Sequence, residues 1–318
     1  SLPRAVLCLY HRHGWVAVSL PARASSIADM RCSLHSLGIL VAWQARVAAS
    51  LRVSMDHTSN LSLALNPRQG LEESEVARLV GPLRPEDRES FPAADRALRR
   101  LSEAYEGHAL EPFWIDGGAF DRHFDQAYAQ LGNASLYGEI LPASVVRMFT
   151  DVGARPGMTY YDLGSGFGKT VLLAGLLGLR ATGVELVDQR WRAACDALSR
   201  AQEVSSSALL PGQVRMVHGN ILKYDFSDAD IVFTDSLAFS DDVIEQLARA
   251  AGRMRNGTRI ITARPLDGAW LKDLETFTAP SSWASDFDWL VQEVRGLPAQ
   301  NHPGLAEVQE EGPATCSS

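Results

Sequence analysis

The stretch that most constrains the fold is residues 158–170, which read Met-Thr-Tyr-Tyr-Asp-Leu-Gly-Ser-Gly-Phe-Gly-Lys-Thr. A short run of β-forming residues leads to Asp162 and then to three glycines at alternate positions, Gly164, Gly166 and Gly168. An apolar helical stretch follows at once. A strand, a glycine turn and a helix in this order bring backbone N–H groups and a helix N-terminus against a nucleotide-like ligand. The sequence therefore predicts a nucleotide-type binding turn here.

Strand and helix patterns alternate on either side of this turn and after it. Strands are predicted at 159–163, 181–186, 213–218, 230–235, 258–263 and 286–294, and helices at 167–177, 188–203 and 240–254. Such alternation predicts a mostly parallel sheet with helices on both faces, which is an α/β fold.

The chain divides by pattern into four regions. These are a poorly defined N-terminal segment at 1–85, a helical region at 86–157, a ligand-binding core at 158–296 and a tail at 297–318. Helical spacing of apolar residues supports the second region, with helices predicted at 93–105, 120–131 and 143–151. Prolines and an acidic pair predict that the tail is disordered.

Composition narrows the class of protein. Apolar residues make up 46% and charged residues 21% of the chain, which is typical of a globular protein. The net charge of -8 argues against a surface that coats nucleic acid. The four cysteines, Cys8, Cys32, Cys195 and Cys316, show no metal-binding or paired spacing. We therefore expect no metal site, no disulfide framework, no membrane span and a reducing intracellular compartment.

A phosphate-binding loop is one hypothesis for the glycine turn, because residues 168–170 supply a Gly-Lys-Thr ending. That motif needs a glycine at position 163, which is Leu163 here. We expect Lys169 to begin a helix and to point to solvent, so nucleotide binding should not depend on it. The segment 231–235 resembles the acidic strand of an ATPase and keeps this hypothesis open.

A dinucleotide fold is a second hypothesis, but it requires the spacing G-x-G-x-x-G, and Asp162 would repel a pyrophosphate. S-adenosylmethionine, which carries cationic groups, suits the acidic positions better. Glu185 stands 21 residues after Gly164, at a strand end where a carboxylate accepts the ribose hydroxyls. Asn220 follows the next strand and is placed to hydrogen-bond the adenine amino group.

The fourth predicted strand of the core ends at Asp235 and Ser236, which should face the reacting methyl group. Methyl transfer to an amine requires mainly alignment and exclusion of water. An oxygen of Asp235 could orient an N–H of the amine. Phe239 or Tyr137 could form the aromatic wall of a narrow channel, which also favours a cation.

These segments occur together in the order and spacing of one family. The segments are Tyr137–Ile140, Asp162–Gly168, Gly183–Glu185, Asp235–Phe239 and Gly257–Thr262. Over roughly residues 115–295 they resemble the non-SET histone-lysine methyltransferases of the disruptor-of-telomeric-silencing type, including their shorter microbial relatives. The resemblance implies a class I S-adenosylmethionine-dependent methyltransferase fold, Rossmann-like with a mostly parallel seven-stranded sheet, preceded by a small helical region.

The resemblance also implies functional residues. It assigns Tyr137 and Glu139 to a lid that closes over the cofactor. The predicted catalytic residues are Asp235, Ser236, Tyr137 and Phe239, and the predicted cofactor-binding residues are Tyr137, Glu139, Asp162, Gly164, Gly166, Gly168, Glu185 and Asn220. Two departures stand out, because Gly219-Asn220 replaces Gly-Asp and Asp235-Ser236 replaces Asn-Asn of the chromatin enzymes.

The main hypothesis is a protein-lysine N-methyltransferase that acts on a histone or nucleosome as a chromatin regulator in the nucleus. A non-histone protein or a small amine as substrate, with a cytoplasmic location, is an alternative. The atypical Asp235-Ser236 pair keeps open a catalytically degenerate cofactor-binding module. We expect no membrane partner, and we find no lysine-rich segment of the kind that grips DNA phosphates.

Overall fold

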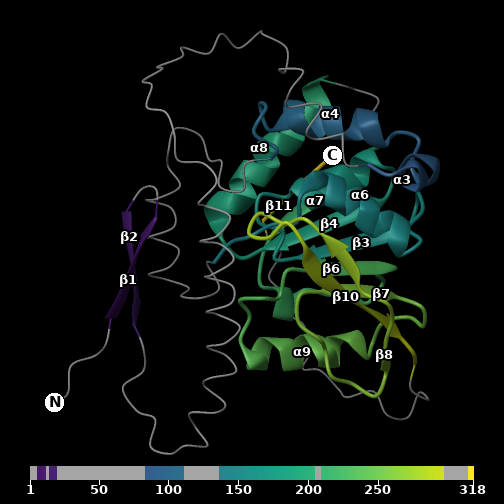
Figure 1. The fold of residues 1–318 in the computed structure, drawn as a ribbon. Helices are drawn as coiled ribbons and strands as arrows, with labels where there is room; N and C mark the ends of the chain where they lie inside the picture. Colours follow the sequence, from purple (N-terminus) through teal and green to yellow (C-terminus); the bar gives the residue numbers. More distant parts are fainter. Residues whose placement is uncertain (1–5, 12–13, 20–82, 111–135, 205–208, 297–313) are drawn as a thin grey trace, which may run out of the picture. The chain divides into compact units, whose positions relative to one another are not determined.

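The computed structural model describes residues 6–11, 14–19, 83–110, 136–204, 209–296 and 314–318 (Figure 1). The chain forms two compact units, Ser1–Ser62 and Leu63–Ser318. In the first unit, β1 (Val6–His11) pairs with β2 (Gly14–Ser19) in an antiparallel hairpin, which the sequence analysis did not predict. The helix predicted at 120–131 lies outside the described residues.

The second unit is built on one large mixed sheet. Its strands are β3 (Thr159–Leu163), β4 (Arg180–Glu185), β5 (Val214–His218), β6 (Ile231–Thr234), β7 (Arg259–Thr262), β8 (Leu271–Asp273), β9 (Phe277–Ala279), β10 (Phe287–Val294) and β11 (Thr315–Ser317). Their order is β11-β5-β4-β3-β6-β7-β10-β8, with β9 beside β10. The five strands from β5 to β7 are parallel, and β10 runs antiparallel between β7 and β8. All six predicted strands are confirmed to within a few residues.

The order of the parallel strands reverses beside β3. The chain passes outward from β3 to β4 and β5, and then returns to add β6 and β7 on the other side of β3. Ligands bind at such a reversal in open α/β sheets, beyond the carboxyl ends of the strands. The glycine turn that follows β3 lies at this point.

Helices cover both faces of the sheet. They are α3 (Pro85–Ser90), α4 (Ala94–Ala104), α6 (Pro142–Asp151), α7 (Lys169–Leu176), α8 (Asp188–Val204) and α9 (Asp241–Ala251), with the short 3-10 helix η3 (Ile221–Lys223). Helices α4, α6, α7 and α8 lie on one face and α9 lies on the other (Figure 1). Among the described helices, none is long and apolar enough to cross a membrane.

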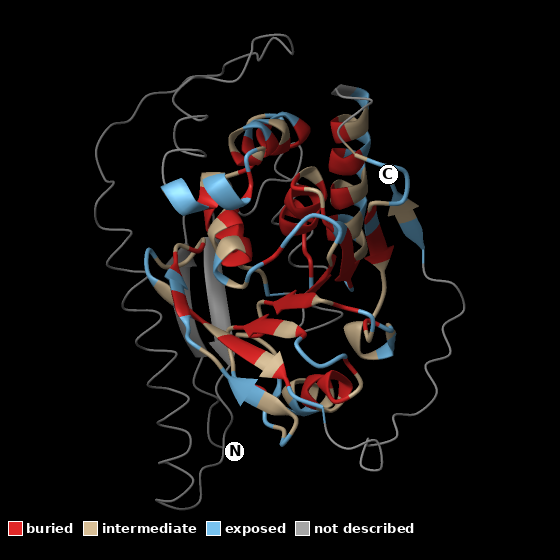
Figure 2. Cartoon of the chain, turned by 90° about the vertical axis from the view of Figure 1, so that its right-hand side faces the viewer, coloured by how far each residue is buried: buried red, intermediate tan, exposed pale blue. Residues whose placement is uncertain are grey.

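Alternate residues of each strand contribute to two hydrophobic cores, as the period of a strand requires. On β3, Tyr160 packs with α4, α6 and α7, whereas Tyr161 packs with α9 on the opposite face. Trp289 of β10 is fully buried beside Phe233, with ring centroids 5.1 Å apart. Figure 2 shows that buried residues fill the central strands and the helix surfaces that face them. The sheet is therefore a rigid support for the loops at its carboxyl edge.

The end of the chain differs from two predictions. The prediction that residues 297–318 are disordered is wrong for Thr315–Ser317, which form β11 against the edge strand β5. Residues 297–313 lie outside the described residues. The expectation of no disulfide is also wrong, because Cys195 of α8 is bonded to Cys316 of β11, with Cα atoms 5.9 Å apart. The two cysteines are 121 residues apart, so no local spacing signals their pairing.

Candidate active site

The glycine turn joins β3 to α7 through backbone conformations that favour glycine. The φ angles of Gly164, Gly166 and Gly168 are 89°, 54° and 75°. A Cβ atom at Gly168 would also lie only 2.9 Å from the Cβ of Ala194 and from the Cε of Met216. Glycine is therefore required both for the turn and for the close approach of α7 to α8 and β5.

Glu185, at the end of β4, is fixed by the turn itself. Its Oε2 accepts a hydrogen bond from the N–H of Gly166 at 2.7 Å, and its Oε1 accepts one from Val187 at 2.7 Å. The N–H of Gly219 donates to the Glu185 carbonyl at 2.9 Å, which brings Asn220 to the same edge. Each carboxylate oxygen has a second lone pair, so Glu185 can still accept bonds from a ligand.

Asn220 caps the N-terminus of η3, and its Oδ1 accepts a hydrogen bond from the N–H of Leu222 at 2.9 Å. The side chain is thereby held in one orientation beside the end of β5. A second lone pair on Oδ1 suits an amino group of a ligand.

Asp162 and Asp235 supply the electrostatic character of the site. Asp162 is 2% exposed, and burial raises its pKa to about 7, although a hydrogen bond from the Thr170 hydroxyl opposes this rise. The carboxylates of Glu185 and Asp235 raise the pKa of Asp162 further. Burial also raises the pKa of Asp235 to about 7, against a weak hydrogen bond from the Leu237 N–H at 3.4 Å.

Neither pKa is lowered by a basic side chain among the described residues. Both carboxyl groups are therefore partly protonated at neutral pH, because each would carry an uncompensated buried charge when ionised. A cationic ligand would compensate that charge. The electrostatics of the turn thus favour a positively charged group and disfavour a phosphate.

The loop before α6 lies directly on the glycine turn. A Cβ atom at Gly166 would collide with the ring of Tyr137. The Tyr137 hydroxyl donates to Glu139 Oε2 at 2.5 Å, and the Lys169 Nζ lies 2.6 Å from Glu139 Oε1. The guanidinium group of Arg190 stands 4.8 Å from the centre of the Tyr137 ring. Tyr137 and Glu139 thus meet the turn at the position predicted for a lid.

The prediction that Lys169 points to solvent is wrong. Lys169 is only 6% exposed, because the loop at 137–139 covers the first turn of α7 and supplies Glu139 as its ionic partner. The side chain also lies 5.7 Å from the centre of the Tyr105 ring. No sequence pattern around Lys169 indicated this, since the partner is 30 residues earlier in the chain.

The same loop meets Asp235 through Gly138. A Cβ atom at Gly138 would lie 2.6 Å from Cε3 and Cζ3 of Trp283 and 3.6 Å from Asp235 Oδ2. Phe239 approaches the glycine turn, with its Cζ 3.5 Å from the Cβ position of Gly164. Trp283 and the carboxyl group of Asp235 therefore meet at Gly138, whereas Phe239 lies against the first glycine of the turn. Phe239 is a predicted site residue, whereas Trp283 is not among the residues that the sequence motifs point to.

Ser236 has a different position from the one predicted. Its side chain is fully buried, and its Oγ accepts a hydrogen bond from the N–H of Arg264 at 3.0 Å. The hydroxyl therefore ties the end of β6 to the segment after β7, rather than facing the turn. It supports the position of the neighbouring Asp235.

A cavity of about 590 Å³ elsewhere in the fold is unrelated to this site. Its lining includes Arg96 and Arg99 of α4 together with Pro156 and Leu177, which precede β3 and β4. It therefore lies at the amino ends of these strands, and none of the predicted site residues lines it. In the described ranges, no group of three or more His, Cys, Asp or Glu residues could hold a metal ion.

The strand order, the glycine turn and the acidic end of β4 define the fold of the class I S-adenosylmethionine-dependent methyltransferases. Residues 125–276 match the family profile described as "Histone methylation protein DOT1". This part of the chain is therefore similar to that family, the non-SET type that the sequence motifs resemble.

Two curated relatives carry the description "Histone-lysine N-methyltransferase, H3 lysine-79 specific". The protein of Emericella nidulans is 29% identical over 145 residues, which are 42% of this chain and 28% of the relative. The protein of Aspergillus fumigatus is 25% identical over 226 residues, which are 63% of this chain and 44% of the relative. The chain thus spans less than half the length of these relatives.

A solved structure that matches part of the chain is an RNA methyltransferase from Salinibacter ruber in complex with S-adenosyl-L-homocysteine. It is 21% identical, with a TM-score of 0.38, and the match covers 51% of this chain and 96% of that one.

Proposed function

We propose that the chain binds S-adenosylmethionine at the glycine turn and transfers its methyl group to the ε-amine of a lysine in a histone. One observation carries the proposal. Two carboxyl groups with raised pKa values, those of Asp162 and Asp235, face the turn and the loop at 137–139 without a basic partner among the described residues. The family match supports the choice of lysine as acceptor and of histone H3 as substrate, and hence a nuclear location.

The residues present fit this cofactor. Asp162 would face its cationic methionyl end, Glu185 its ribose hydroxyls and Asn220 its adenine amino group. The loop that holds Tyr137 and Glu139 would close over it. When bound, S-adenosylmethionine supplies an electrophilic methyl group on a sulfonium centre.

Asp235 is the residue we assign to the acceptor lysine. A lysine reaches the site as an ammonium ion and must lose a proton before its lone pair can attack the methyl group. An ionised Asp235 Oδ2 attracts the ammonium group and accepts that proton, and a carboxyl pKa of about 7 suits a general base at neutral pH. A cationic cofactor would lower the pKa of Asp235, and thus favour the ionised form when both ligands are present.

The aromatic rings of Trp283 and Phe239 would help to exclude water from the reacting atoms. Trp283 packs against Gly138, which also approaches Asp235 Oδ2, and Phe239 packs against Gly164 of the glycine turn. Exclusion of water strengthens the attraction between the carboxylate and the ammonium ion. The rings also stabilise a cation through their faces.

Transfer of a radiolabelled methyl group from S-adenosylmethionine to nucleosomes, free histones and a lysine-rich unrelated protein tests the proposal. We expect label on histone H3, and a loss of at least about a hundredfold in kcat/KM for Asp235→Ala. Asp162→Asn should weaken cofactor binding. The matched control Asp196→Asn, which changes an exposed carboxylate on α8, should leave both unchanged.

The result also separates the alternatives. Label only on the unrelated protein or on a small amine would replace the histone substrate and keep the enzyme class. Cofactor binding without any transfer, with activity gained in Asp235→Asn, would identify a catalytically degenerate cofactor-binding module. Absence of both binding and transfer would refute the proposal.

A further inference from the structure

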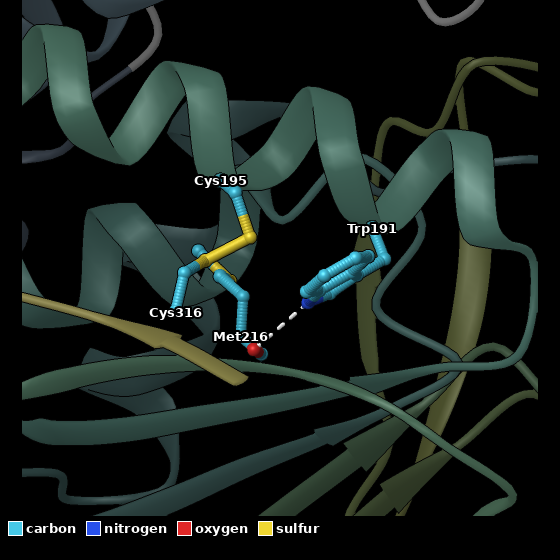
Figure 3. The surroundings of a disulfide bond; sticks show 4 residues. All are labelled: Trp191, Cys195, Met216 and Cys316. Atoms are coloured by element: carbon cyan, nitrogen blue, oxygen red, sulfur yellow. Dashed lines mark hydrogen bonds between the residues drawn. A yellow bond between two sulfur atoms is a disulfide. The ribbon is translucent and has the colours of Figure 1, made fainter. Parts of the chain in front are cut away.

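The disulfide joins the end of the chain to the helix that follows the acidic strand end. Cys195 lies on α8 and Cys316 lies in the middle of β11, so the bond spans the gap between this helix and the edge of the sheet (Figure 3). Beside it, the indole N–H of Trp191 on α8 donates to the carbonyl oxygen of Met216 on β5 at 2.9 Å. The bond thus lies where α8, β5 and β11 meet.

The last residues of the chain complete the edge of the sheet. The N–H of His218 donates to the carbonyl of Ala314 at 2.9 Å, and the N–H of Gly212 donates to the carbonyl of Ser318 at 2.6 Å. Ser318 also donates its N–H to the Val214 carbonyl at 3.0 Å, and its Oγ accepts from the Val214 N–H at 3.1 Å. The end of the chain therefore satisfies backbone groups along the whole of β5.

These contacts alone are too few to hold the strand. β11 has only three residues, and none of the residues 314–318 is fully buried. A strand this short contributes little apolar burial to offset the entropy lost when it is ordered. The covalent bond between Cys195 and Cys316 therefore decides whether β11 remains on β5.

We propose that Cys195 and Cys316 form a reversible thiol–disulfide modification site that fastens the C-terminal strand to β5 when oxidised and releases it when reduced. Both cysteines are half-buried, so a small thiol can reach them. Reducing compartments keep most protein thiols reduced. The fraction of a protein that carries an accessible disulfide therefore depends on the ratio of thiol to disulfide in the surrounding solution.

The exchange reaction balances with a low-molecular-weight thiol such as glutathione. One glutathione thiolate attacks a sulfur of the bond, forms a mixed disulfide with one cysteine and releases the other as a thiol. A second glutathione attacks the mixed disulfide and leaves as glutathione disulfide. Two electrons and two protons pass from the two glutathione molecules to Cys195 and Cys316, and oxidation is the reverse.

Release of β11 should also affect the glycine turn. Met216 is the central residue of β5, and its side chain contacts Gly168 at the start of α7. Loss of the neighbouring strand and of the link to α8 would loosen this packing. Weaker binding of S-adenosylhomocysteine by the reduced protein is therefore expected, a consequence that rests on the proposed function.

The first experiment maps the bond and the strand in the full-length protein equilibrated with oxidised or reduced glutathione. Tryptic digestion without reductant should release the peptides 193–200 and 296–318 as one disulfide-linked pair from the oxidised sample. Hydrogen exchange of the amides of Gly212, Val214 and His218 should be on the order of tenfold faster after reduction. Cys316→Ser should exchange at the reduced rate in both buffers, and Cys8→Ser should behave as the unchanged protein.

Absence of the joined peptides in the oxidised sample would overturn the proposal. Equal exchange of the three amides in the oxidised and reduced protein would also overturn it. This comparison uses the unchanged chain, so it remains decisive even if Cys316→Ser does not fold. Cofactor binding is measured separately. If reduction speeds exchange but S-adenosylhomocysteine binds to neither form, the proposed function fails while the modification site stands.

Discussion

Replacement of Asp235 by asparagine should stabilise the ligand-free protein at neutral and alkaline pH. The carboxyl group has its pKa raised from 3.8 to about 7, because burial penalises its charged form. The difference between these values corresponds to at most about 4 kcal/mol at high pH. Asparagine has nearly the same shape, carries no charge and retains an oxygen that can accept the hydrogen bond from the Leu237 N–H.

The pH dependence has a definite sign. The pKa of Asp235 in the folded state lies above its unfolded value, so the folded protein binds this proton more tightly than the unfolded chain. The favourable contribution of Asp235 to the free energy of unfolding is therefore fully present below about pH 4. It is lost as the pH rises through about 7, and changes little above about pH 8.

Urea unfolding of the unchanged protein and of Asp235→Asn at pH 4.5 and pH 8 measures this contribution. The free energy of unfolding of Asp235→Asn should exceed that of the unchanged protein by about 3 kcal/mol more at pH 8 than at pH 4.5. Asp196→Asn, on the exposed surface of α8, should show no such difference and serves as the control. An advantage of Asp235→Asn that is the same at both pH values, or that decreases with pH, would refute the reasoning.

Three further perturbations test other parts of the structure. Gly138→Ala should cost about 1–3 kcal/mol of folding stability in denaturant unfolding and displace Trp283, since the new methyl group would lie 2.6 Å from its ring. Lys169→Met should cost about 3 kcal/mol because it leaves the Glu139 carboxylate buried without its ion pair, and the added change Glu139→Gln should recover part of that loss. Reduction of the disulfide between α8 and β11 should lower the free energy of unfolding by up to about 5 kcal/mol, because the bond joins residues 121 positions apart. Denaturant unfolding with and without a thiol reductant measures this difference. Equal stability in any of these comparisons would contradict the corresponding contact.

Much of the fold is encoded locally and could be predicted. The strands of the core alternate with helices at clear hydrophobic periods, and β3 matches its predicted range of 159–163. Three of the strands that were missed, β8, β9 and β11, have only three residues each. Strands this short carry too few residues for an alternating pattern, and their pairing to β10 and β5 fixes them instead.

The site was predictable where one backbone segment determines it. The glycines of the turn and the strand-end residue Glu185 follow from local spacing, and the structure brings them together. Lys169, Trp283 and Ser236 differ because their surroundings come from distant segments. The partner of Lys169 lies in the loop before α6, and the partner of the Ser236 hydroxyl follows β7. No periodicity in the sequence encodes such contacts.

Titration calorimetry of the ligand-free protein tests the central claim most directly. S-adenosylmethionine should bind, and repetition in buffers of different ionisation enthalpy should show release of up to about one proton at pH 7, because its cationic groups lower the pKa values of Asp162 and Asp235 from about 7. S-adenosylhomocysteine, which lacks the sulfonium charge, should bind with less proton release, and ATP should not bind at the turn. Failure of both S-adenosyl compounds to bind, or preferential binding of ATP, would contradict the account.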